Sequence, residues 1–156
     1  MKNLIIILIA FFSFTSASAQ YEVPPYKKDK NIPMFELLKV DNSVWSSAKL
    51  KKNQPVTIIF FSPVCEHCIH QFEDMVKNMK SLKNVQIVMA TYQPIEELAE
   101  FNKKYNIAKY TNIVTGRDAN YFLPPFYRVT NFPYFAFYDK NGKFKSVFEG
   151  NLSVEN

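Results

Sequence analysis

The sequence predicts a single α/β domain with a mixed central β-sheet and flanking helices. Two short runs rich in β-branched and aromatic residues, 55–61 and 85–91, are separated by apolar residues at steps of three and four. This pattern is typical of a parallel β–α–β unit. Two further runs, 134–138 and 144–148, flank the turn sequence Asp139-Lys140-Asn141-Gly142 and predict an antiparallel hairpin. A parallel unit followed by a hairpin gives a mixed sheet.

The composition agrees with one folded domain and excludes several other classes of protein. The chain has 156 residues, of which 47% are hydrophobic and 21% charged, with only two Cys, two His and three Gly. These values exclude a disordered chain, a collagen-like chain, a disulfide-dense scaffold and a four-cysteine zinc site. The formal net charge is +5, and the lysines occur in small, scattered groups. We interpret them as a solvated, mildly basic surface, with a nucleic-acid or anionic-membrane footprint as the less favoured alternative.

The first nineteen residues indicate an export signal. A positive start at Lys2 precedes an apolar run at 4–12, and Ala17-Ser18-Ala19 is typical of a cleavage site. The apolar run is shorter than the roughly 20 residues that cross a membrane; an uncleaved anchor is the alternative. We expect residues 1–19 to be removed as a signal peptide after Ala19, which makes the protein periplasmic, in a compartment where disulfides persist. Residues 20–33 are then an extended lead-in, and 34–156 form the domain.

The elements up to the first helix follow from turn residues and apolar spacing. Residues 34–40 predict a first strand, which ends at the turn sequence 41–43. The run 55–61 is apolar on both faces, as expected of a central strand that is covered on both sides. A helix after Cys65 is predicted by its apolar positions, which are Ile69, Phe72, Val76, Met79 and Leu82.

The second half continues with two helices and a short strand. Pro94 opens a helix whose first turn is acidic, as the helix dipole prefers. Residues 112–115 predict a short strand that ends at Gly116. A further helix is expected to begin near Asp118 and to be interrupted by Pro124-Pro125.

The chemistry of the chain is concentrated in Cys65-Glu66-His67-Cys68. Both cysteines and both histidines of the chain lie within residues 65–70, at the predicted strand-to-helix junction. Cys65 then lies at the start of the helix and Cys68 one turn inside it, so their sulfurs can form a disulfide across that turn. The partial positive charge at the helix N-terminus favours a thiolate on Cys65, which makes that thiol the attacking nucleophile. A Cys-x-x-Cys motif after a buried strand is typical of a redox site.

Other interpretations of this motif stay open from the residues alone. A structural disulfide is one, although it closes only a short loop and constrains little chain. A non-catalytic module that binds or delivers a metal such as copper is another, with Cys65, Cys68 and either His67 or His70 as ligands. A peroxidatic cysteine is a third, because Ser62 lies three residues before Cys65. Against it, Ile58 stands where peroxiredoxins place a proline.

Two segments carry a resemblance to a known family. The segment Phe60-Phe61-Ser62-Pro63-Val64-Cys65-Glu66-His67-Cys68 resembles the active site of thioredoxin-fold proteins, and in particular the exported TlpA/ResA-like thiol–disulfide oxidoreductases. The segment Val129-Thr130-Asn131-Phe132-Pro133-Tyr134, followed by Asp139-Lys140-Asn141-Gly142-Lys143, resembles the stretch that carries the cis-proline of this fold. The resemblance extends from about Pro33 to Gly150.

The resemblance implies a thioredoxin-like fold and an enzyme that exchanges disulfides with protein substrates, acting as a reductase. Cys65 is then the attacking thiol, Cys68 the resolving thiol and Pro133 the cis-proline beside them. It implies no cofactor beyond the Cys65–Cys68 disulfide, no metal and no nucleic-acid partner, and it implies a membrane thiol reductase as electron donor. Phe132 is expected to contact substrate. His67 is expected to stabilise the Cys65 thiolate, an effect that Glu66 opposes.

The sequence departs from the family pattern at three positions near the motif. Ile59 occupies the place of a buried Asp that thioredoxins carry, and Gln71 replaces the Glu of many TlpA-like proteins. Because Gln cannot titrate, the usual proton acceptor is absent; Glu66, Glu73 or water are the candidate replacements. Glu73 also replaces a helix-kinking proline, so the helix should run straighter.

The C-terminus also departs from the family pattern. Only residues 151–156 follow the hairpin, where the thioredoxin fold normally closes with a helix. Six residues are too few for a stable helix. We expect the last helix to be incomplete and an apolar patch to be exposed on the sheet face that it would cover, a patch that would favour dimerisation.

Overall fold

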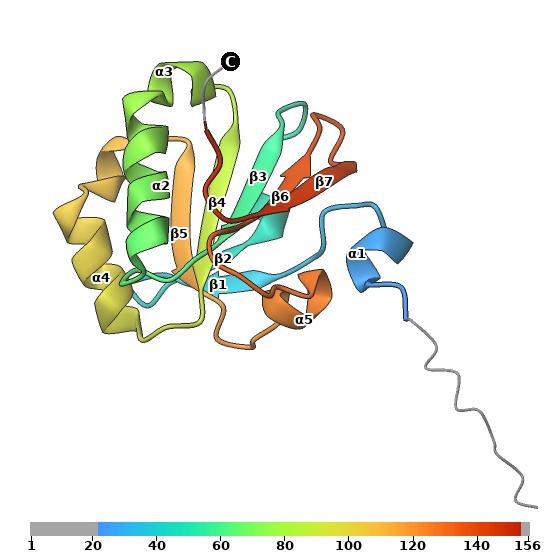
Figure 1. Cartoon of the computed structure of the whole chain (residues 1–156), viewed down its shortest axis with the longest axis horizontal. Coiled ribbons are helices and arrows are strands. Elements are labelled where there is room, and N and C mark those ends of the chain that lie inside the picture. The colour runs from blue at the N-terminus through green and yellow to red at the C-terminus, as the bar shows by residue number, and fades with distance from the viewer. Residues whose placement is uncertain (1–21, 154–156) are drawn as a thin grey trace, which may run out of the picture.

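Seven strands form one mixed β-sheet at the centre of this computed structural model, which describes residues 22–153 (Figure 1). The predicted signal peptide, 1–19, lies outside the described residues. Within 22–153 no helix is both long and apolar enough to cross a membrane. The strands are β1 (Glu36–Leu38), β2 (Val44–Ser46), β3 (Val56–Phe60), β4 (Gln86–Thr91), β5 (Ile113–Arg117), β6 (Tyr134–Tyr138) and β7 (Phe144–Glu149).

The strand order β2-β1-β5-β4-β3-β6-β7 confirms the predicted mixed sheet. Strands β3, β4 and β5 are parallel, whereas β6 pairs antiparallel with β3 and β7 with β6. Ile58 in the middle of β3 lies between Val88 of β4 and Ala136 of β6. All three of these side chains are buried, so the sheet is covered at its centre as the apolar run 55–61 predicted.

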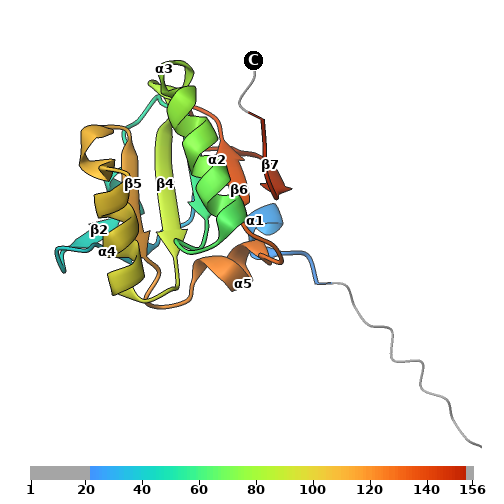
Figure 2. The ribbon, with the colours of Figure 1, turned by 60° about the vertical axis from the view of Figure 1, so that its left-hand side comes forward.

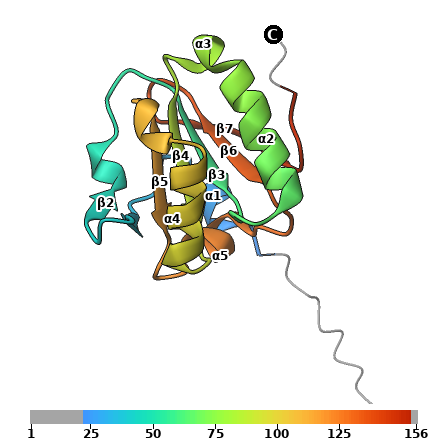
Figure 3. The same ribbon diagram turned by 90° about the vertical axis from the view of Figure 1, so that its left-hand side faces the viewer.

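The helices cover both faces of the sheet. They are α1 (Pro25–Lys28), α2 (Glu66–Lys77), α3 (Met79–Leu82), α4 (Ile95–Lys104) and α5 (Leu123–Tyr127), with the 3-10 turns η1 (Ser47–Lys49) and η2 (Ile107–Lys109). Helices α2 and α4 lie on one face, and α1 lies behind the sheet (Figures 2 and 3). Phe72 and Phe101 join α2 to α4 through an edge-to-face ring contact of 5.1 Å. Tyr26 of α1 and Tyr127 of α5 are buried in the core on the opposite face.

Two local features of the sheet differ from the prediction. The short strand β2 was not predicted; it pairs with β1 at the edge of the sheet and buries Trp45. Gly116 does not end β5 but lies within it. A Cβ at Gly116 would come within 2.5 Å of the Leu37 Cβ, so this glycine allows β1 to approach β5 closely.

The helix expected near Asp118 begins later, at Leu123. Pro124 lies in the first turn of α5, where a backbone N–H has no partner within the helix and proline costs little. The buried Asp118 carboxylate instead accepts hydrogen bonds from the backbone N–H groups of Phe122 (3.0 Å) and Leu123 (2.7 Å). The predicted interruption by the two prolines is therefore wrong: they start the helix.

The expected extended lead-in is partly helical and is packed into the domain. Pro25 begins the single turn of α1, and Tyr26 is only 6% exposed. Its ring lies 5.7 Å from that of Tyr127 and 5.1 Å from that of Phe144. A bridge between Asn31 and Lys143 adds backbone pairing to the hairpin. We therefore place the start of the folded unit before residue 34.

No helix follows β7 in the described chain. Residues 151–153 have no regular secondary structure, and 154–156 lie outside the described residues. Near residues 151–153, on the sheet face that carries α2, Phe137 is half-buried and Phe148 is 39% exposed. Leu152 covers part of this face and lines a small hollow of about 90 Å³. The expected apolar patch is present, and Leu152 covers part of it.

Replacing Tyr26 by Ala should lower the free energy of unfolding by about 3 kcal/mol, because a buried ring is lost. Urea unfolding would measure the change. Lys30→Ala, at an exposed position two residues after α1, is the control and should change stability by less than about 0.5 kcal/mol. Equal stability of the two variants would show that α1 is only loosely attached.

Candidate functional site

The Cys-x-x-Cys motif lies where β3 passes into α2, at the carboxyl ends of the parallel strands. Cys65 is the N-cap residue of α2, with extended backbone angles (φ −79°, ψ 122°). Its N–H donates to the Ser62 carbonyl at 3.2 Å, and its carbonyl accepts from the Ile69 N–H at 3.0 Å. Cys68 lies one turn later, so the motif occupies the helix start that the sequence predicted.

The two thiols, both free in the structure, differ in exposure. Cys65 is partly exposed, whereas Cys68 is only 2% exposed. The pKa of the Cys68 thiol is raised to about 12, chiefly because the thiol is buried; a hydrogen bond with the Ser62 backbone lowers the pKa, and the adjacent Cys65 thiol raises it. The accessible thiol is therefore suited to attack, and the buried one is held protonated in reserve.

The loop before β6 approaches the same helix start. The Phe132–Pro133 peptide bond is cis, and Pro133 is buried. The Pro133 carbonyl accepts from the Gly150 N–H at 2.8 Å. The next residue, Asn151, donates from its side-chain amide to the His67 carbonyl at 3.0 Å. These two bonds connect the proline loop, the end of β7 and the first turn of α2.

The charged residues of the motif face solvent. The side chain of Glu66 is 87% exposed, and His67 is also exposed. His70 lies on the outer face of α2, 3.9 Å from both Glu66 and Glu73. Among residues 22–153 no group of three or more His, Cys, Asp and Glu side chains is placed to hold a metal ion. The structure thus adds no observation in favour of a copper module.

Gln71 has a structural partner that the sequence did not reveal. It is 3% exposed, its side-chain amide donates to the Leu152 carbonyl at 2.9 Å, and its Oε1 accepts from the Leu152 N–H at 2.5 Å. Gln71 therefore holds the chain after β7 against α2 in the way a neighbouring strand would. Glu73, a candidate proton acceptor, accepts a hydrogen bond from the Tyr105 hydroxyl at 3.1 Å.

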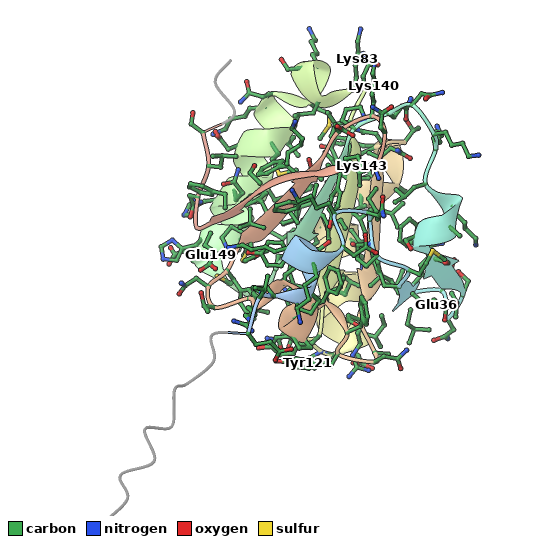
Figure 4. The ribbon with its side chains drawn as sticks, turned by 90° about the vertical axis from the view of Figure 1, so that its right-hand side faces the viewer. Glu36, Lys83, Tyr121, Lys140, Lys143 and Glu149 are labelled. Atoms are coloured by element: carbon green, nitrogen blue, oxygen red, sulfur yellow. The ribbon has the colours of Figure 1, made fainter. Side chains whose placement is uncertain are left out.

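Two tyrosines that were not predicted as part of the site form an aromatic surface with the predicted Phe132 at the same sheet edge. Tyr92 follows the end of β4, Tyr121 follows β5, and Phe132 precedes β6. The Tyr92 ring lies 5.7 Å from that of Tyr121 and 6.0 Å from that of Phe132. Tyr121 is 56% exposed, and Figure 4 shows it at the end of the molecule opposite Lys83. The sequence could have predicted this surface, because each of these aromatic residues flanks a strand end at the sheet edge where Cys65 lies.

Solved structures share this fold. A putative thioredoxin from Neisseria meningitidis matches with a TM-score of 0.65 and 21% identity, covering 81% of this chain and 84% of its own. A putative thiol:disulfide interchange protein DsbE from Chlorobium tepidum matches with a TM-score of 0.63 and 22% identity. This match covers 80% of the present chain and 87% of the DsbE chain. A secreted disulfide oxidoreductase of Mycobacterium tuberculosis, homologous to E. coli DsbE, matches with a TM-score of 0.62 and 20% identity. This match covers 78% of the present chain and 87% of the M. tuberculosis chain. The predicted thioredoxin-like fold is confirmed.

The sequence itself decides the family, because the model of the AhpC/TSA family matches residues 29–151. The chain belongs to the AhpC/TSA family. No curated protein sequence matches it significantly. The chain therefore combines membership of the AhpC/TSA family with a thioredoxin-like fold, and the resemblance to TlpA/ResA-like proteins is confirmed. The match begins at residue 29, which agrees with the packing of the chain before residue 34 into the domain.

The raised pKa of Cys68 predicts how the second chemical step depends on pH. Only the thiolate attacks a disulfide. Burial, the largest cause of the raised pKa, persists when Cys65 is in a mixed disulfide, so the thiolate fraction of Cys68 rises about tenfold per pH unit throughout the neutral range. The resolution rate should therefore increase about tenfold per pH unit between pH 6 and pH 9. Stopped-flow reaction of the reduced protein with an aromatic disulfide measures it as the second phase of thiol release.

Cys68→Ser is the control for this assignment, because that variant should release only the first equivalent of aromatic thiol. A plateau of the second phase below pH 9 in the unmodified protein would contradict the prediction.

Proposed function

We propose that this protein is an exported thiol–disulfide oxidoreductase that reduces disulfides in protein substrates. The observation that carries the proposal is the pairing of a partly exposed Cys65 at the N-cap of α2 with a buried Cys68 one turn later. An accessible nucleophile and a sheltered resolving thiol are what a two-step exchange requires. A purely structural disulfide has no use for this asymmetry.

The reaction runs through a mixed disulfide. The Cys65 thiolate attacks one sulfur of a substrate disulfide, forms a new S–S bond and releases the other sulfur as a thiolate. Cys68 then loses its proton and attacks Cys65, which forms the Cys65–Cys68 disulfide and releases the second substrate thiolate. The substrate gains two electrons and, after protonation, two protons; the enzyme loses the same. A membrane thiol reductase returns two electrons to the enzyme.

The surface beside Cys65 fits an unfolded or extended polypeptide. We expect Phe132 and Tyr92, whose rings lie 6.0 Å apart, to offer substrate an apolar contact next to the motif. We infer that the backbone before Pro133, which lies outside β6, pairs with an extended substrate segment. Such main-chain pairing is tolerant of sequence, which suits an enzyme that recognises a disulfide within varied proteins.

Export and the reductive direction rest on the sequence. Residues 1–19 have the features of a signal peptide, and cleavage after Ala19 would deliver the chain from Gln20 onward to the periplasm. The Mycobacterium tuberculosis protein of the same fold is described as secreted. In an oxidising compartment disulfides persist, so reducing a particular disulfide there requires a dedicated reductant.

The proposal is tested by the reduction of insulin with dithiothreitol. The protein from Gln20 onward should accelerate precipitation of the insulin B chain, and Cys65→Ser should return the rate to that of dithiothreitol alone. Cys68→Ser should accumulate a mixed disulfide with substrate, visible on a non-reducing gel and lost on reduction. Equal rates for the unmodified protein and Cys65→Ser would refute the proposal.

His67→Pro should make the enzyme more reducing. The imidazole stabilises the thiolate, which exists only in the reduced form, so its loss should lower the reduction potential. The expected decrease is on the order of 30 mV, equal to about 1.4 kcal/mol. Proline is tolerated in the first turn of α2. Equilibration with glutathione measures the potential, and His70→Ala on the outer face of α2 is the control. An unchanged or higher potential would show that His67 has no influence.

A further inference from the structure

Exposed lysines gather at the end of the sheet opposite the motif. The segments 50–55, 78–85 and 105–112 precede the amino ends of the parallel strands, and 139–143 is the β6–β7 turn. Because Cys65 follows the carboxyl end of β3, all four segments lie at the far edge. Figure 4 shows Lys83 and Lys140 projecting from this end. We call the following set the basic pole: Lys51, Lys52, Lys80, Lys83, Lys109, Lys140 and Lys143.

The charge of the basic pole is not neutralised within the protein. All seven side chains belong to exposed residues, and none forms an ion pair with a carboxylate of residues 22–153. The four segments contain a single acidic residue, Asp139. Its carboxylate accepts hydrogen bonds from the backbone N–H groups of Asn141 (2.9 Å) and Lys143 (3.0 Å). The lysine groups that are scattered in the sequence thus form one surface in space.

A hollow within the basic pole combines cations with apolar side chains. It has a volume of about 430 Å³, and Lys51, Lys52 and Lys140 lie along it. Leu50 contributes apolar surface to the same hollow, and Met34, also a lining residue, is 70% exposed. Lysine ammonium groups bind phosphate as point charges, and an exposed methionine tolerates an apolar environment. This combination fits the interfacial layer of a phospholipid bilayer.

The opposite end of the molecule carries both signs of charge. Arg117, at the end of β5, donates a hydrogen bond to the Tyr92 carbonyl there. Glu66 lies in the first turn of α2, and Glu96 and Glu97 lie in the first turn of α4, next to the motif. A protein with one strongly positive end acquires a preferred orientation near an anionic surface, whereas evenly mixed charge gives none. An anionic plane attracts the basic pole more strongly than it attracts the mixed end that carries Cys65.

We propose that the basic pole docks on the surface of an anionic phospholipid bilayer and holds Cys65 facing away from it. A plane fits better than a narrow partner, because the seven lysines come from four segments spread over one whole end of the molecule. Each lysine near an anionic leaflet adds a modest attraction, and the attractions add when all are in reach. The proposal extends the function proposed above and does not depend on the thiol chemistry.

The test uses residues 20–156, which contain every element described, with both cysteines replaced by Ser. Co-sedimentation should show binding to vesicles that contain phosphatidylglycerol, weakening as salt rises, and no binding to phosphatidylcholine vesicles. Lys51→Glu combined with Lys140→Glu should lower the partition coefficient at least about tenfold. The control combines Lys27→Glu with Lys28→Glu, on α1, which makes the same change in net charge. This pair should lower the partition coefficient by about twofold or less.

Orientation is read from an environment-sensitive dye on a single introduced cysteine. Ser81→Cys, within the basic pole, should shift its emission on anionic vesicles, and Ala119→Cys, after β5, should not. Equal loss of binding in the two charge-reversal pairs would overturn the proposal, as would equal binding to both kinds of vesicle. Binding to polyglutamate but not to vesicles would instead assign the pole to an acidic protein. Insulin reduction by Lys51→Glu, Lys140→Glu protein with intact cysteines should be unchanged.

Discussion

The burial of β3 on both faces is the constraint on which the rest of the structure depends. Ile58 and Phe60 face one core, and Ile59 and Phe61 face the other. A strand that is apolar on both sides must be covered on both sides. Its neighbours therefore pair along both edges, and α2 turns back over one face immediately after the strand ends. That return places Cys65 at the helix cap and Cys68 inside the core, and this burial is the main cause of the raised pKa of Cys68.

Local signals in the sequence were sufficient for the central elements. The β3–α2–β4 unit, α4 and the β6–β7 hairpin were predicted because each has its own periodicity, turn residues or first-turn charges. The motif itself was placed by the junction between β3 and α2. Features that depend on distant partners were not predicted. β2 exists through its pairing with β1, and α1 is held by rings from α5 and the hairpin.

Gln71 illustrates the same limit within the site. The sequence alone described this position only by what it lacks: Gln71 replaces the Glu that serves as proton acceptor in many TlpA-like proteins. Its partner, Leu152, lies 81 residues after Gln71, in a segment without regular secondary structure, so no sequence pattern predicts the contact. The two amide–backbone bonds give the position a mechanical role that no local pattern encodes. The lysines of the basic pole are a similar case, since only the topology brings their four segments to one edge.

The position of the single tryptophan decides what optical spectroscopy reports on this protein. Trp45 is 8% exposed, packs 5.9 Å from Phe35 and lies in β2, an edge strand. Four strand spacings separate β2 from β3, which amounts to roughly 19 Å across the sheet. Its fluorescence therefore follows the loss of the whole fold and is insensitive to oxidation of Cys65 and Cys68. Trp45 fluorescence will therefore report unfolding without interference from the redox state of the motif, and the redox state must be measured by thiol chemistry.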